Sequence, residues 1–281
     1  MNIRTDIAVE NFDDSEPLPE GIHRYRRGGI FSTTEIVIDS DDYVKETGKG
    51  KGKYVSLESR GLSGFSDNYR EMAEEIAEEI SKFVPGGEVL VIGLGNTDIT
   101  PDSIGPITVS KVLATRHLRF EGNGDDFLRS LRSVSCISAG VMGQTGIESA
   151  EVVKAVCSEI KPSAVIAVDS LACSDIKRLG TTIQITDTGI SPGSGVANAR
   201  KELSEKTLGI PVIAIGIPTV TDMRTIVYNL TGTELERSGS DMMVTPRDID
   251  RLTERSSHIL SLAVNLALQP SLTFEEVSGL F

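Results

Sequence analysis

The sequence predicts an α/β fold, a three-layer α/β/α sandwich around a mostly parallel, doubly wound sheet. Between residues 89 and 217, short runs that are apolar on both faces alternate with helical segments. This alternation is typical of strands buried beneath helices on both sides of a sheet. With 281 residues the chain can bury a core of ordinary size. Two β-like runs before the alternating region predict an N-terminal hairpin extension.

The first part of the chain, residues 1–30, is polar and has no sustained period, which favours a loosely held arm or a peripheral layer. Residues 34–39 and 52–58 are β-like runs, and the Gly- and Lys-rich stretch between them predicts an exposed turn. The extension therefore falls within residues 30–66. In residues 68–83 apolar side chains recur at helical spacing opposite a row of glutamates, which predicts an amphipathic helix.

The rest of the chain supplies the strands and helices of the sandwich. The expected strands are residues 89–94, 134–139, 164–168, 182–185 and 212–217. The expected helices are residues 104–116, 147–160, 196–206 and 246–268. Thr245 and Pro246 have the residue types favoured at the N-cap and first position of the last helix. Since no repeat or linker interrupts the pattern, we expect one α/β domain.

The composition excludes several classes of function. The chain has 28 Lys and Arg against 41 Asp and Glu, a net charge of −13, which disfavours binding to nucleic acids and anionic membranes because both are polyanions. Cys136, Cys157 and Cys173 are odd in number and lack metal-ligand spacing, so neither a disulfide framework nor a zinc site is indicated. Membrane-span and signal-peptide patterns are absent from the sequence. We therefore expect a cytoplasmic protein.

Asp102 is the first candidate for chemistry, because ligands of open α/β sheets bind beyond the carboxyl ends of the strands. It follows the strand at 89–94 in a glycine turn, and Thr100 and Pro101 predict a helix start just before it. An aspartate in a first helical turn also serves simply to complement the helix dipole. Asp98 in the same loop is a further candidate.

Asp169 is the second candidate, because it directly follows the apolar run 164–168. A charge at the end of a buried strand must be paired, hydrogen-bonded or directed into a cleft. If this strand and the strand at 89–94 are parallel, Asp169 and Asp102 emerge at the same edge of the sheet. Two adjacent carboxyl groups cannot both ionise freely, so one serves as acid and the other as base. The pair predicts a hydrolase that activates water against an amide.

The remaining motifs are weaker. Gly93 and Gly95 begin a dinucleotide fingerprint, but Asp98 occupies the position of its third glycine. Residues 140–146 resemble a phosphate loop without its lysine, and no histidine lies in a strand-end loop to serve a serine or cysteine triad. A shaped loop near the same edge could bind substrate backbone or be a purely structural turn. Its candidate residues are Asp187, Thr188, Gly189, Gly193, Ser194 and Gly195.

Seven ordered blocks resemble the germination proteases of endospore-forming bacteria, peptidase family A25. They are residues 4–10, 50–55, 93–102, 139–146, 168–172, 187–196 and 215–219. The resemblance implies a phosphorylase/hydrolase-like sheet between helices, as in hydrogenase maturation proteases. It also implies a catalytic pair at Asp102 and Asp169, with no metal and no cofactor. The stretch 229–241 and the tail after residue 269 depart from the family pattern.

The resemblance further implies an endopeptidase that initiates degradation of small acid-soluble spore proteins during germination. Such a protein is a homotetramer of the spore core, made as a self-processing precursor. Residues 5–10, Thr-Asp-Ile-Ala-Val-Glu, nearly copy the family's cleavage pattern. Cleavage between Asp6 and Ile7 would leave a propeptide at 1–6 and a peptidase domain at 7–281. The alternative is a polar start that is not processed.

Two other functions stay open at this point. One is a related maturation protease whose acidic loop, with Asp98 or Asp102, senses a metal. The other is a non-enzymatic α/β protein whose Gly-rich strand-end loops hold a small anion.

Overall fold

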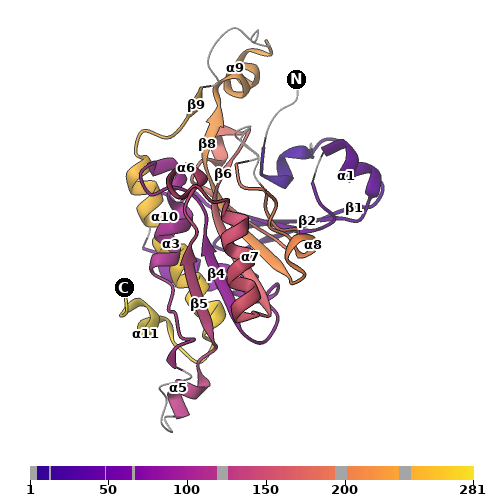
Figure 1. Ribbon diagram of the computed structural model, residues 1–281. Helices are drawn as coiled ribbons and strands as arrows, with labels where there is room; N and C mark the ends of the chain where they lie inside the picture. The colour runs from indigo at the N-terminus through magenta and orange to yellow at the C-terminus, as the bar shows by residue number, and fades with distance from the viewer. Residues whose placement is uncertain are drawn as a thin grey trace.

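The computed structural model describes residues 5–12, 14–47, 49–64, 67–118, 126–193, 201–233 and 242–281. In this part of the chain nine strands form one sheet with helices on both faces, which confirms the predicted three-layer α/β/α class (Figure 1). The strands are β1 (Ile22–Gly28), β2 (Ser32–Ile38), β3 (Gly52–Glu58), β4 (Val89–Gly93), β5 (Val134–Ser138), β6 (Ala164–Ala172), β7 (Thr182–Thr186), β8 (Val212–Asp222) and β9 (Met243–Val244).

The helices are α1 (Asp41–Thr47), α2 (Tyr69–Ser81), α3 (Ile104–Ser110), α5 (Asp126–Ser130), α6 (Met142–Thr145), α7 (Ser149–Ile160), α8 (Glu205–Leu208), α9 (Met223–Thr231), α10 (Ile249–Leu268) and α11 (Phe274–Ser278). Three short 3-10 helices are η1 (Ala8–Asn11), η2 (Thr100–Asp102) and η3 (Ile176–Arg178). No helix in these described residues is long and apolar enough to cross a bilayer.

The sheet is mixed, so the expectation of a mostly parallel sheet is wrong. Its order is β1-β2-β3-β7-β8-β6-β4-β5, with β9 beside β8. The four strands from β8 to β5 are parallel, whereas β7, β3, β2 and β1 continue the sheet in antiparallel steps. Only a short connection with the 3-10 helix η3 joins β6 to β7. Because such a connection cannot return the chain to the other end of the sheet, β7 runs opposite to β6.

The expected hairpin exists, but it is part of the main sheet. β2 and β3 pair with each other as predicted, and β3 then pairs with β7. Helix α1 occupies much of the connection where a simple turn was expected. Strand β1 lies in the region expected to be a loose arm or a peripheral layer; the arm is wrong for these residues, because they form the edge strand of the sheet. β1 is an edge strand in which only Ile22 is buried, so its sequence carries no apolar alternation to reveal it.

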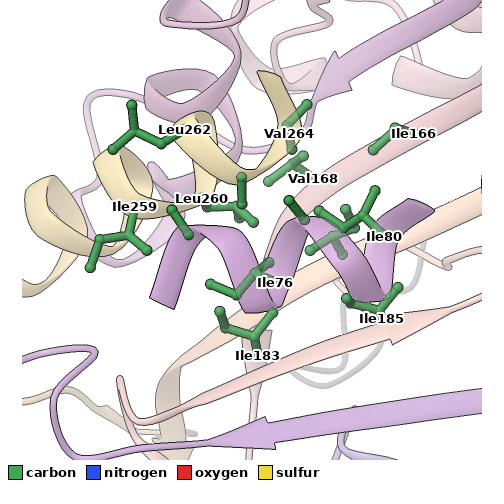
Figure 2. Packing of buried hydrophobic residues seen from close by; sticks show 14 of the residues in the cluster. Ile76, Ile80, Ile166, Val168, Ile183, Ile185, Ile259, Leu260, Leu262 and Val264 are labelled. Atoms are coloured by element: carbon green, nitrogen blue, oxygen red, sulfur yellow. The ribbon is translucent and has the colours of Figure 1, made fainter. Parts of the chain in front are cut away.

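Two apolar layers hold the sandwich together. On one face α2, α3 and α10 cover the sheet, and Figure 2 shows Ile76 and Ile80 of α2 between α10 and the β7 residues Ile183 and Ile185. On the other face α7 lies over the sheet (Figure 1), and its Val153 belongs to one buried cluster with residues of β4 and β6. Each fully buried Ile or Leu side chain contributes about 1.5–3 kcal/mol. Successive residues of β4 point into opposite layers, which explains its uniformly apolar sequence.

Two helices have other boundaries than expected, because hydrogen bonds with other elements replace those that would extend or cap the helix. α3 ends at Ser110 rather than near residue 116, because the Asn265 side chain of α10 pairs with Leu113 N–H (2.8 Å) and the Lys111 carbonyl (2.9 Å). α10 begins after Pro246, since the Thr245 hydroxyl donates to Thr219 O at 2.8 Å instead of capping the helix. Of the helix expected at 196–206, residues 196–200 lie outside the described residues.

Glu79 ties the antiparallel half of the sheet to the helical layer. This residue, on the inner side of α2, is only 2% exposed. It accepts hydrogen bonds from both terminal nitrogens of Arg27 on β1 and from Lys82 Nζ at 2.7 Å. Burial alone would raise the pKa of Glu79, but these hydrogen bonds and charges outweigh it and lower the pKa below its usual value.

We predict that Glu79→Gln lowers the free energy of unfolding by about 1 kcal/mol at neutral pH, because two cations lose their shared anion. Since the folded-state pKa of Glu79 is lowered, the stabilisation is present above the unfolded pKa and disappears as pH falls through the folded value. Urea denaturation at pH 7 and at pH 3 measures both effects. Glu78→Gln, which alters an exposed neighbour, is the control. An equal loss at the two pH values would contradict the assignment.

Candidate active site

The parallel half of the sheet contains a topological switch point. From β4 the chain adds β5 on one side, then returns to add β6 and β8 on the other. Ligands of open α/β sheets bind at such a point, beyond the carboxyl ends of the strands. β4 ends with Gly93 opposite Val168, whereas β6 continues beside β8 to Ala172. β6 therefore projects past its neighbour at this edge.

Asp169 is the first residue of β6 beyond the end of β4. The expectation that it ends its own strand is wrong, because β8 keeps pairing with β6 past this position. Asp169 is only 4% exposed, and its Oδ1 accepts the N–H of Ser170 at 2.8 Å. The sequence reasoning still found the correct edge of the sheet, since β4 stops where the apolar run of β6 stops.

Asp102 reaches the same edge from the loop after β4. It lies in the 3-10 helix η2, ahead of α3, and Thr100 does not cap α3 as was expected. Its backbone is fixed by hydrogen bonds from Asp102 N–H to Ile99 O (2.7 Å) and from Asn96 N–H to Asp102 O (2.9 Å). The buried Thr219 hydroxyl of β8 donates to the adjacent Pro101 carbonyl at 2.6 Å. The loop is therefore anchored to the strand beyond β6.

Two glycines allow this loop to lie against the strands. Gly95 has a φ of +113°, and a Cβ there would stand 2.0 Å from Asp102 O. A Cβ on Gly105, in the first turn of α3, would stand 2.3 Å from Leu94 O and 2.4 Å from Val168 O. These distances are shorter than atomic contacts allow, so only glycine permits the close approach. The glycines serve backbone packing, consistent with rejecting the dinucleotide motif.

Both aspartates line one cavity of about 350 Å³, which we call the aspartate cavity. Asp6, Pro192 and Gly193 also line it. The structure thus brings together the two predicted catalytic residues, one residue of the predicted cleavage site and part of the predicted substrate loop. Two carboxyl groups that line one cavity supply the pair of groups that acid and base catalysis needs.

Asp187, Thr188 and Gly189 of the predicted substrate loop do not line this cavity. Asp187 Oδ1 accepts the N–H of Lys53 on β3 at 2.8 Å, and the Thr188 hydroxyl pairs with Thr186 at 3.0 Å. Gly189 has a φ of +80°, and a Cβ there would stand 2.2 Å from Leu203 O. These three residues form a turn beside β3, while Ser194 and Gly195 lie outside the described residues. The exposed Asp98 accepts a hydrogen bond from Gln144 at 2.8 Å.

The N-terminal segment, residues 5–12, is packed onto the projecting end of β6, so of the two expectations, a loose arm or a peripheral layer, the loose arm is wrong for these residues. Asp6 N–H donates to Ala172 O, and Ala172 N–H donates to Asp6 Oδ2, both at 2.9 Å. Ile7 and Ala8 are fully buried, and Ile7 packs against Leu171. The segment looked polar in sequence because its few apolar residues lie among charges.

Lys49 and Gln184 contact this segment, and sequence reasoning missed both. Lys49 Nζ lies 2.8 Å and Gln184 Nε2 lies 2.9 Å from Asp6 O. Lys49 belongs to the Gly- and Lys-rich stretch expected to be an exposed turn, yet burial lowers the pKa of its ammonium group. A lysine between glycines gave no signal of burial, because its partners come from residues distant in the sequence.

A separate carboxylate site holds the far end of the segment. Glu10 Oε2 accepts the Ser174 N–H and hydroxyl, each at 2.7 Å, and Oε1 accepts the Asp175 N–H at 3.0 Å. Arg178 Nε lies 3.4 Å from Glu10 Oε1. The segment is therefore fixed at both Asp6 and Glu10, with apolar side chains buried between them.

Two of the cysteine thiols are poor nucleophiles near neutral pH. Burial raises the pKa of Cys136 to about 12 and also raises the pKa of Cys173, so these thiols stay protonated near neutral pH. Within the described ranges, no group of three or more His, Cys, Asp or Glu side chains is arranged to hold a metal ion.

Comparison with known proteins agrees with the sequence blocks. The sequence matches the family described as Germination protease, peptidase family A25, over residues 22–231. The chain belongs to this family. The germination protease of Clostridium tetani is 37% identical over 99% of this chain and 99% of its own length. That of Bacillus velezensis is 38% identical over 99% of this chain and 77% of its own length.

These matches confirm the resemblance predicted from the seven sequence blocks. Members of this family are peptidases. Among solved structures, a nickel-iron hydrogenase maturation protease from Thermococcus kodakarensis covers 66% of this chain and 98% of its own. It is 15% identical, with a TM-score of 0.38.

We predict that Gly105→Ala destabilises the protein by about 1–3 kcal/mol, because its methyl group would overlap backbone oxygens that cannot move aside. Urea denaturation measures the change. Gly143→Ala is the matched control, since nothing lies within 4 Å of a Cβ at that helical glycine. Equal stability of the two variants would contradict the close approach of α3 to β4 and β6.

Proposed function

We propose that this chain is an endopeptidase that initiates degradation of small acid-soluble spore proteins during germination. Membership of the germination protease family supports the protease activity and the biological setting. The observation that carries the mechanism is the aspartate cavity, which Asp102, Asp169 and Asp6 line together. Two carboxyl groups thus share a cavity with a residue of the peptide bond they would cut.

The proton transfers of the proposed reaction use the two aspartates and water. One carboxylate takes a proton from water, and the water oxygen attacks the carbonyl carbon of the scissile peptide. The carbonyl electron pair moves onto its oxygen and forms a tetrahedral oxyanion. When this collapses, the carbon–nitrogen bond breaks and the other carboxyl group gives its proton to the leaving nitrogen. The products are a new carboxyl group and a new amine, and either aspartate can take either role.

The first substrate in this proposal is the chain itself. Cleavage between Asp6 and Ile7 would remove residues 1–6 as a propeptide and leave the peptidase domain 7–281. Two observations support it: Asp6 lines the aspartate cavity, and the segment around it is held in place on the projecting end of β6. Pro192 and Gly193, which line the same cavity, would contact the backbone of protein substrates.

Location and assembly complete the proposal. The family resemblance implies a homotetramer in the spore core. Light scattering of the purified chain tests the assembly, and an antibody against it tests the location in sectioned spores.

We predict that incubation of the purified chain at mildly acid pH releases the residues before Ile7, because acidification supplies the proton that an aspartate pair must hold. Asp102→Asn and Asp169→Asn should each slow this cleavage at least ~100-fold, the usual effect of removing a general acid or base. Mass spectrometry of the new N-terminus measures the rate.

Asp98→Asn is the control, since this exposed carboxylate lies in the same loop as Asp102. It should cleave at the wild-type rate, and a chelator should leave all rates unchanged. Undiminished cleavage in either of the other two variants would remove that aspartate from the mechanism. Inhibition by the chelator would point to a metal.

A further inference from the structure

The carbonyl oxygen of Asp6 receives two side-chain hydrogen bonds. Lys49 Nζ donates at 2.8 Å and Gln184 Nε2 donates at 2.9 Å. This is the oxygen of the peptide bond between Asp6 and Ile7. In any attack by water on that bond, negative charge develops on this atom.

Gln184 is held rigidly in the position from which it donates. Its residue is 5% exposed on β7, and its Oε1 accepts the N–H of Ala8 at 2.7 Å while Nε2 donates to Asp6 O. One amide group is thus hydrogen-bonded to the backbone on both sides of Ile7. The amide N–H therefore already points at the oxygen and can stabilise negative charge on it without a side-chain rotation.

Gln184 and Asp169 also face the same side of the sheet. Gln184 pairs with Gly216 of β8, and Gly216 pairs with Asp169 of β6. Residues in register on neighbouring strands point to the same face. Gly216 has no side chain, and Leu171 packs onto it. The donor and the candidate catalytic carboxylate therefore flank one glycine on the face where the segment lies.

Lys49 directs a half-buried cation at the same oxygen. Its Nζ also donates to Thr5 O at 3.0 Å, so both hydrogen bonds go to neutral backbone carbonyls. Burial lowers the pKa of Lys49, and the carboxylates of Asp6 and Glu10 oppose that effect. A cation stabilises an anionic oxygen more than a neutral one, and the difference grows where water is excluded.

We propose that Lys49 and Gln184 stabilise the oxyanion formed at the scissile peptide bond. The inference rests on the proposed cleavage between Asp6 and Ile7. It assigns β7 and the connection before β3 a part in the reaction, in addition to the two aspartates. When a protein substrate replaces residues 5 and 6, the two donors would bind the equivalent carbonyl oxygen of that substrate.

A simple anchor would behave differently from an oxyanion donor. Loss of an anchor weakens binding of the ground state, which raises KM for a peptide or frees the segment sooner. Loss of a donor that acts in the transition state lowers kcat with little change in KM. The two roles therefore change different kinetic constants.

The test uses the processed enzyme and a synthetic peptide with the sequence of residues 3–12. Lys49→Met removes the charge, and Gln184→Glu keeps the shape and the acceptor for Ala8 while removing the donor. We expect each to lower kcat by about 10²–10³-fold, as for removal of one oxyanion donor, with KM within about threefold of wild type. Lys49→Arg restores a charged donor and should recover at least tenfold of the activity lost in Lys49→Met.

Lys51→Met is the matched control, because this exposed lysine pairs with Asp41 at the surface. It should retain wild-type kcat. Unchanged kcat, or faster self-cleavage, in Lys49→Met or Gln184→Glu would overturn the inference. So would loss of activity in Lys49→Met without any recovery in Lys49→Arg when thermal melts show both to be folded.

Asp102→Asn, assayed alongside, separates this inference from the proposed function. If wild type does not cut the peptide after its aspartate, or if Asp102→Asn cuts it equally well, the proposed function fails. If Asp102→Asn is inactive while Lys49→Met is not impaired, only the oxyanion assignment fails.

Discussion

The arrangement of the candidate site depends on one constraint, the unequal length of two neighbouring parallel strands. β4 ends opposite Val168, but β8 supports β6 as far as Ala172. The backbone beyond Val168 therefore has a free side toward the loop after β4. That side receives the loop carrying Asp102 through Gly95 and Gly105, and the far end of β6 receives the N-terminal segment. A longer β4 would fill the space that both occupy.

The two halves of the mixed sheet contribute different chemical groups to this region. The parallel half contributes carboxylates, which the switch point places beyond the strand ends. The antiparallel half contributes an amide from β7 and a cation from the connection before β3. The hairpin is therefore more than an addition to the edge of the sheet, because its pairing with β7 brings Lys49 over the segment. Asp6 is common to both sets of groups, because it lines the aspartate cavity and its carbonyl oxygen accepts hydrogen bonds from both donors.

Sequence reasoning could locate Asp102 and Asp169 because their signal is local. Each follows an apolar run, and parallel strands end at a common edge. Lys49 and Gln184 were out of reach because their roles depend on contacts with residues 5–8, far away in the chain. The expected parallel sheet was wrong for a related reason: a strand's direction depends on its connection, and the apolar run of β7 has no directional signal. The extension of β6 beyond its apolar run was also missed, because it depends on pairing with the neighbouring strand β8.

The docked segment has a quantitative consequence for competition. Because residues 5–12 belong to the same chain, they are present at the end of β6 at an effective concentration of the order of millimolar. A peptide in solution must match that value or bind more tightly to displace them. A cut between Asp6 and Ile7 would remove this high effective concentration only for residues 5 and 6, which bind at Lys49 and Ala172. Ile7 and Glu10 would remain covalently tethered, and they would continue to compete for Leu171 and Arg178.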